Sequence, residues 1–69
     1  MDKTEIKIRF TYHPPQGEQW KKYEEIRAKA KELAELLNKL CPESREKSLA
    51  LTKLEESVMW GNASIARRE

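Results

Sequence analysis

Apolar positions recur every three or four residues through most of the chain, which is the period of an amphipathic α-helix. The first stripe ends at Leu40 and predicts a helix over residues 17–40. Pro42 cannot continue this helix but suits the first position of the next one, predicted over residues 42–67. Because the connection is short, the two helices are expected to form an antiparallel hairpin. The predicted stripes are Tyr23, Ile26, Ala30, Leu33, Leu37 and Leu40, followed by Leu51, Leu54, Val58 and Ile65.

The N-terminal segment, residues 1–16, follows a different pattern. Ile6, Ile8 and Phe10 alternate with charged residues, which is the period of a β-strand. A lone strand has no partner in this chain. We therefore predict an extended arm that lays these three side chains onto the helices or onto a neighbouring subunit. The predicted fold is all-α, with residues 1–69 forming one domain.

The second predicted helix carries more apolar surface than one partner helix can bury, because Leu49, Met59 and Trp60 widen its stripe. A chain of 69 residues is also marginally stable on its own. Its single cysteine, Cys41, cannot close an internal disulfide. We therefore expect a symmetric homo-oligomer.

Charged and hydrophobic residues each make up 38% of the chain, and the net charge is +2. This mixture is too apolar for a disordered chain, and it lacks the clustered basic surface of a general DNA or RNA binder. No apolar run reaches the length of a membrane span or forms the core of a signal peptide. The lone cysteine is typical of a reducing compartment. A cytosolic protein with neither a nucleic-acid nor a membrane partner is expected.

Catalytic and metal-binding residues are not predicted. One histidine and one cysteine make a poor metal set. Cys41 lies at the turn between the helices and His13 lies before the first one. At about 1.5 Å of rise per residue, the first helix separates the two residues by roughly 35 Å. No glycine-rich phosphate loop is present, and no spacing forces two glutamates into one site. The prediction is a protein without enzymatic activity, metal or cofactor.

The strongest candidate for a binding site is the segment RFTYHPP, residues 9–15. Its prolines restrict the backbone around His13, and Tyr12 offers a flat ring on which a base can stack. Alternatively, Tyr12 packs on the helices and the nearby basic residues are solvated partners of Glu24 and Glu25. The segment SREKS, residues 44–48, is either an anion site at a helix N-terminus or a capped, salt-bridged first turn. The cations near Tyr12 in sequence are Arg9, Lys21, Lys22, Arg27 and Lys29.

Three stretches together carry a resemblance: RFTYHPP, IRAKAKELAELLN and CPESREKSLALTKLEESVMWGNASIAR. Over residues 6–67 the chain resembles the small phage anti-CBASS sponge proteins, which sequester cyclic oligonucleotides. The resemblance implies a helical hairpin assembled as a homohexamer. It also implies binding of cyclic dinucleotides such as 3′,3′-cyclic GMP-AMP between protomers, without cleavage, in the cytoplasm of the infected bacterial host. Bacterial CBASS immunity is thereby blocked. Some members also hold cyclic trinucleotides in pockets formed by three protomers.

The resemblance also implies roles for individual residues. Tyr12 would stack on a purine, Arg27 would contact the phosphates, and His13 and Arg9 would be further contacts for the dinucleotide. Lys29, Arg67 and His13 would belong to the trinucleotide pocket. Two other functions stand as alternatives to the sponge: a small helical oligomer that binds a host protein and no nucleotide, and an enzyme that degrades the same messengers.

Overall fold

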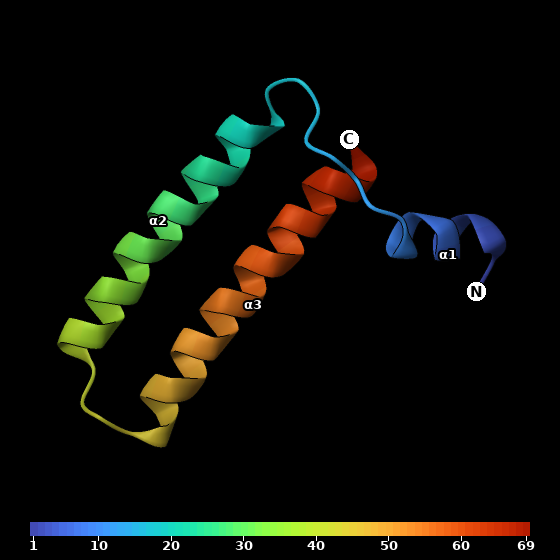
Figure 1. The fold of residues 1–69 in the computed structure, drawn as a ribbon. Helices are drawn as coiled ribbons and strands as arrows, with labels where there is room; N and C mark the ends of the chain where they lie inside the picture. Colours follow the sequence, from blue (N-terminus) through green and yellow to red (C-terminus); the bar gives the residue numbers. More distant parts are fainter.

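The computed structural model describes residues 1–69 as three helices without strands (Figure 1). The helices are α1, Lys3–Phe10; α2, Gln19–Leu40; and α3, Arg45–Arg68. The predicted antiparallel hairpin is confirmed, since α2 and α3 run side by side in opposite directions. α1 lies beside the C-terminal part of α3, and a linker from Thr11 to Glu18 leads from it to α2. None of the helices is long and apolar enough to cross a membrane.

The predicted extended arm is wrong, because α1 is helical. The side chain of Asp2 caps this helix by accepting a hydrogen bond from the Glu5 N–H at 2.8 Å. An unpaired strand would leave its backbone N–H and C=O groups without partners, whereas a helix satisfies most of them within the segment. The sequence signal for this helix is an N-cap residue followed three positions later by glutamate. The alternation of Ile6, Ile8 and Phe10 favoured a strand instead, so the helix was not predicted.

The two predicted apolar stripes form most of the seam between α2 and α3. All four predicted residues of α3 are half-buried, whereas Leu33 and Leu40 of α2 are exposed. Ala34, which the predicted stripe did not include, is half-buried. A single partner helix covers only a narrow strip of α2, so the outer members of its stripe remain open. The half-buried seam residues include Tyr23, Ile26, Ala30, Ala34, Leu37, Leu51, Leu54, Val58 and Ile65.

The turn between the helices differs from the prediction at one end. Cys41 is extended, as expected for the residue before a proline. Pro42 does not open α3; the helix begins at Arg45, after Ser44. Ser44 is the N-cap, and its Oγ accepts a hydrogen bond from the Lys47 N–H at 3.1 Å. The buried Lys47 ammonium in turn pairs with the Glu43 carboxylate. The capped, salt-bridged turn is therefore confirmed for this segment.

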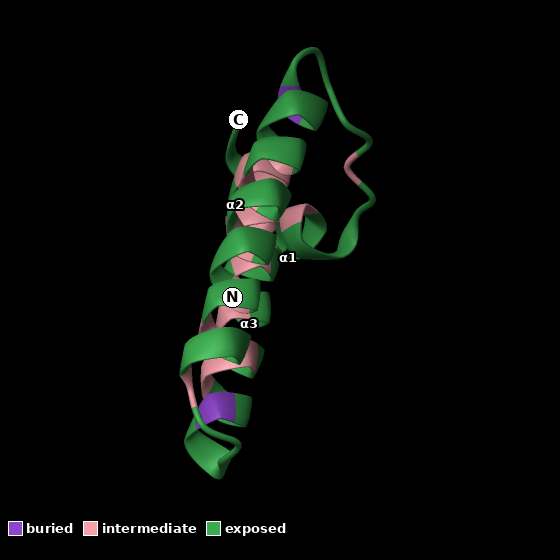
Figure 2. Cartoon of the chain, turned by 90° about the vertical axis from the view of Figure 1, so that its left-hand side faces the viewer, coloured by how far each residue is buried: buried purple, intermediate pink, exposed green.

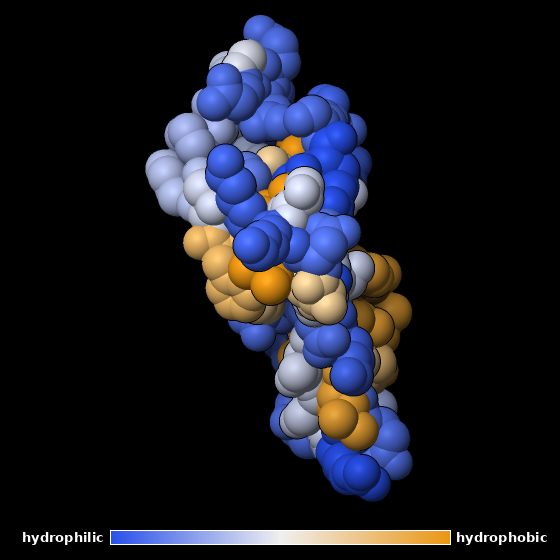
Figure 3. Space-filling model, turned by 90° about the vertical axis from the view of Figure 1, so that its right-hand side faces the viewer, coloured by the Kyte–Doolittle hydropathy of each residue, from blue (hydrophilic) through white to orange (hydrophobic).

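The single chain has no hydrophobic core. No apolar residue is buried, and the two buried residues are Gln19 and Lys47 (Figure 2). The Cα radius of gyration is 15.2 Å, whereas a compact chain of this length has about 11 Å. The accessible surface is 5879 Å², roughly 1,400 Å² more than a compact monomer of this mass exposes. Apolar patches stand open between charged side chains on the side of α1 (Figure 3). Much of the apolar surface is thus left for other contacts.

Candidate functional site

A hollow of about 540 Å³ lies where the linker, α2 and α3 meet, and we call it the Tyr12 hollow. It brings together five of the six predicted site residues, from segments far apart in the sequence. Three arginines and one histidine line it, and no carboxylate does. The hollow is therefore basic, with aromatic rings at its wall. Its lining residues are Arg9, Thr11, Tyr12, His13, Pro15, Tyr23, Arg27, Asn62, Ala63, Ala66 and Arg67.

Helical spacing explains how α2 and α3 contribute to this lining. Tyr23 and Arg27 are four residues apart on α2, so they share one face. Ala63 and Arg67 have the same spacing on α3, and Ala66 lies beside them. The small alanine side chains keep this part of the wall open. The space beside Tyr12 therefore follows from the residue types on the two facing helices.

The ring of Tyr12 is available for stacking. Its side chain is 80% exposed, so it does not pack on the helices. The alternative of a packed Tyr12 is wrong for the single chain. An exposed aromatic ring in a hollow lined by cations is suited to a planar, anionic ligand.

The guanidinium groups of the hollow fall into two classes. Arg27 and Arg67 form no ion pair with any carboxylate of the chain, whereas Arg9 Nε lies 3.1 Å from Glu5 Oε1. The alternative in which Arg27 pairs with a glutamate of α2 is therefore wrong. An unpaired guanidinium presents several N–H donors in a planar fork, the geometry that matches a phosphate.

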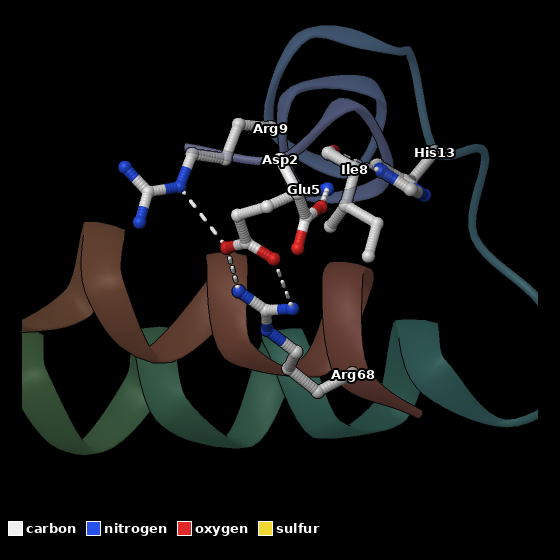
Figure 4. A network of polar contacts seen from close by, with 6 residues as sticks. All are labelled: Asp2, Glu5, Ile8, Arg9, His13 and Arg68. Carbon is white, nitrogen blue, oxygen red and sulfur yellow. Dashed lines mark hydrogen bonds and ion pairs between the residues drawn. The ribbon is translucent and has the colours of Figure 1, made fainter.

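His13 is half-buried and supports the end of α1. Its Nε2 lies 2.7 Å from the Ile8 carbonyl oxygen (Figure 4). A carbonyl only accepts hydrogen bonds, so Nε2 carries the proton and donates it. Nδ1 remains as the polar ring atom with which His13 can contact a ligand.

Comparison with known proteins agrees with this architecture. A family model described as Acb2/Tad1, hairpin domain, matches residues 2–66, which is nearly the whole chain. The chain belongs to the Acb2/Tad1 hairpin family. This is the anti-CBASS sponge family, so the resemblance seen in the sequence is confirmed. No curated protein and no solved structure matches the chain.

One predicted residue lies apart from the others in this Acb2/Tad1 hairpin. Lys29 lines a separate hollow on the hairpin together with Lys22, and its Nζ lies 3.7 Å from Glu32 Oε2. Lys29 and Arg27 differ by two positions, which rotates them about 200° around the helix axis. Within one protomer, Lys29 is thus not brought to the hollow that Arg67 and His13 line. The predicted trinucleotide set stays a prediction that needs residues from more than one protomer.

Tyr23 of α2 and Asn62 of α3 line the Tyr12 hollow but were not among the predicted site residues. Tyr23 was assigned to the apolar stripe, although its spacing of four from Arg27 was a usable signal. The sequence indicates that Asn62, beside Trp60 and Ile65, either fixes the register of an interface or touches a ligand, but it does not assign Asn62 to a nucleotide pocket. Its Oδ1 is buried and has no hydrogen-bond partner in the chain. A buried acceptor without a donor is destabilising, so an N–H group supplied there would be stabilising.

Polar contacts fix both ends of the segment that carries Tyr12. At one end, Arg68 and Arg9 bind the Glu5 carboxylate (Figure 4). The pKa of Glu5 is lowered from 4.5 to about 2, mainly by the hydrogen bonds from Arg68 and next by the hydrogen bond from Arg9. At the other end, the buried Gln19 donates from Nε2 to the Ile65 carbonyl at 3.3 Å. Both contacts attach the segment to the last turns of α3.

Proposed function

We propose that this protein is a non-enzymatic sponge that binds and sequesters cyclic dinucleotides, with 3′,3′-cyclic GMP-AMP as the first candidate. The observation that carries the proposal is the exposed Tyr12 ring in a hollow with two unpaired guanidinium groups, those of Arg27 and Arg67, and no carboxylate. A cyclic dinucleotide consists of two bases and two phosphates. Each of these groups has a chemical counterpart in the Tyr12 hollow.

In the proposed complex, Tyr12 stacks on a purine and Arg27 donates hydrogen bonds to a phosphate. Arg9 and His13 are further contacts at the edge of the same hollow. Stacking tolerates any base, whereas the cations require an anionic ligand. The proposed action is to hold the messenger intact, so that the CBASS effector in the infected bacterial cytoplasm is deprived of it.

A homohexamer is the proposed assembly. The protomer has no buried apolar residue, and its accessible surface exceeds that of a compact monomer by roughly 1,400 Å². A standard interface buries about 800 Å² from each partner. The surplus therefore supports association through more than one surface. A two-fold interface would place two Tyr12 rings and two Arg27 groups around one two-fold ligand. Cyclic trinucleotides would be held by Lys29, Arg67 and His13 of different protomers.

The test is a depletion and release experiment. The protein is mixed with 3′,3′-cyclic GMP-AMP, the free messenger is measured, and the mixture is then heated to denature the protein. Depletion followed by release of intact messenger is the expected result. Depletion with loss of the messenger would identify an enzyme, and no depletion would leave a protein-interaction module.

A further inference from the structure

The segment that carries Tyr12 has no buried apolar anchor. Tyr12 follows α1 by two residues, and no residue of α1 is buried. Phe10, the last residue of α1, is 81% exposed. Ile8 is the one apolar residue of α1 that is half-buried, so apolar packing gives α1 little hold on the hairpin. Polar contacts at the two ends of the segment attach it to the hairpin, and the hydrogen bond between His13 and the Ile8 carbonyl braces it internally.

The first of these contacts is the Glu5 clamp, which consists of Glu5, Arg9 and Arg68. Arg68 Nη2 and Nη1 donate to Glu5 Oε1 and Oε2 at 2.5 and 3.1 Å, and Arg9 Nε donates to Oε1 at 3.1 Å (Figure 4). A two-point contact between guanidinium and carboxylate fixes orientation as well as distance. The Glu5 clamp thus docks α1 on the last turn of α3.

The second contact holds the far end of the linker. Gln19 Oε1 accepts from the Gln16 N–H at 2.9 Å, and Gln19 Nε2 donates to Glu69 Oε1 at 3.3 Å. The Lys22 ammonium pairs with the same Glu69 carboxylate. The linker between the two contacts includes Pro14 and Pro15, whose rings restrict the backbone. With both ends attached to α3, the linker has little freedom left around Tyr12.

We propose that Glu5 is a positioning residue for ligand binding: by docking α1, it holds Tyr12 at the hollow with Arg27 before a cyclic dinucleotide arrives. This inference rests on the proposed function. Without the Glu5 clamp, the Tyr12 segment is attached at one end, and each residue that the ligand must order costs conformational entropy. The apparent Kd rises as the population of the competent conformation falls.

The sign of the effect distinguishes positioning from plain electrostatics. Glu5 is an acidic residue whose partner Arg9 lines the ligand hollow. If Glu5 acted through charge alone, its removal would free Arg9 for the phosphates and would tighten binding. The positioning role requires weaker binding instead.

The experiment is calorimetry of the full-length protein with 3′,3′-cyclic GMP-AMP. Glu5→Gln is expected to weaken binding about fivefold, the upper range for an exposed ion pair. Glu5→Arg and Arg68→Glu should each weaken it, and their combination should restore it in part, since positions 5 and 68 again form an ion pair while Arg9 loses its carboxylate. The matched control is Glu56→Gln, which removes an exposed carboxylate 3.5 Å from Lys53 and outside the hollow, and which leaves the Kd unchanged.

Hydrogen exchange of the ligand-free protein gives a second readout. Glu5→Gln should speed amide exchange in α1 while exchange in α2 stays as in the parent, which shows that the hairpin is folded. If the parent binds no cyclic GMP-AMP, the proposed function fails, while the exchange still reports whether Glu5 docks α1. Tighter binding by Glu5→Gln, or weaker binding without faster exchange in α1, would overturn the positioning role.

Discussion

Replacing Tyr12 by alanine tests the proposed site most directly, because the ring contributes little to the fold. The side chain is 80% exposed, so the area it buries, taken at about 25 cal/mol per Å², contributes about 1 kcal/mol of folding free energy. Stacking contributes about 1–3 kcal/mol per base. In the proposed two-fold site, two rings on one dinucleotide would contribute about 2–6 kcal/mol, and the lower value corresponds to a loss of about 30-fold in affinity.

Calorimetry with 3′,3′-cyclic GMP-AMP measures this loss. Tyr12→Phe keeps the ring and should bind within about threefold of the parent, a difference below 1 kcal/mol. Trp20→Ala is the matched control, since Trp20 is also a large exposed aromatic residue but lies outside the Tyr12 hollow. If a folded Tyr12→Ala variant bound as tightly as the parent, stacking on Tyr12 would be refuted.

Four further predictions follow from the site and the fold. Arg27→Gln should lose about 1.5–3 kcal/mol of binding free energy per phosphate contact and flatten the salt dependence of Kd in calorimetry; an unchanged salt slope would contradict the phosphate contact. Ser44→Ala should lower the free energy of unfolding in urea by about 1 kcal/mol, whereas Ser44→Asp should retain it. The folded-state pKa of Glu5 is lowered to about 2 from 4.5, so the stability from the Glu5 clamp is present above pH 4.5 and is lost as the pH falls towards 2. Hydrogen exchange in α1 should show this loss, and the Glu5→Gln variant should lack this pH dependence. Light scattering should find an oligomer, and a clean monomer at micromolar concentration would contradict the proposed hexamer.

Local signals in the sequence account for most of the secondary structure. The three- and four-residue spacing of Leu51, Leu54 and Val58 placed the seam correctly, because this period records which side of a helix faces its partner. Pro42 located the turn, since its ring cannot continue a helix. The N-terminal segment was predicted wrongly, because three alternating apolar residues also fit a helix when a cap such as Asp2 is present.

The sequence by itself thus determined an antiparallel helical hairpin with surplus apolar surface, and it pointed to the sponge family. The resemblance already placed Arg9 and Arg27 with Tyr12, and only the tertiary structure decided that Arg67 joins them while Lys29 does not. Apolar spacing defines one face of each helix, but it leaves open how charged residues on the other faces meet. Packing α3 against α2 brings Arg67 to the hollow that Arg27 lines, while Lys29 turns away from it. The contact between Glu5 and Arg68 joins opposite ends of the chain. It exists because folding returns the last turn of α3 to the N-terminal helix.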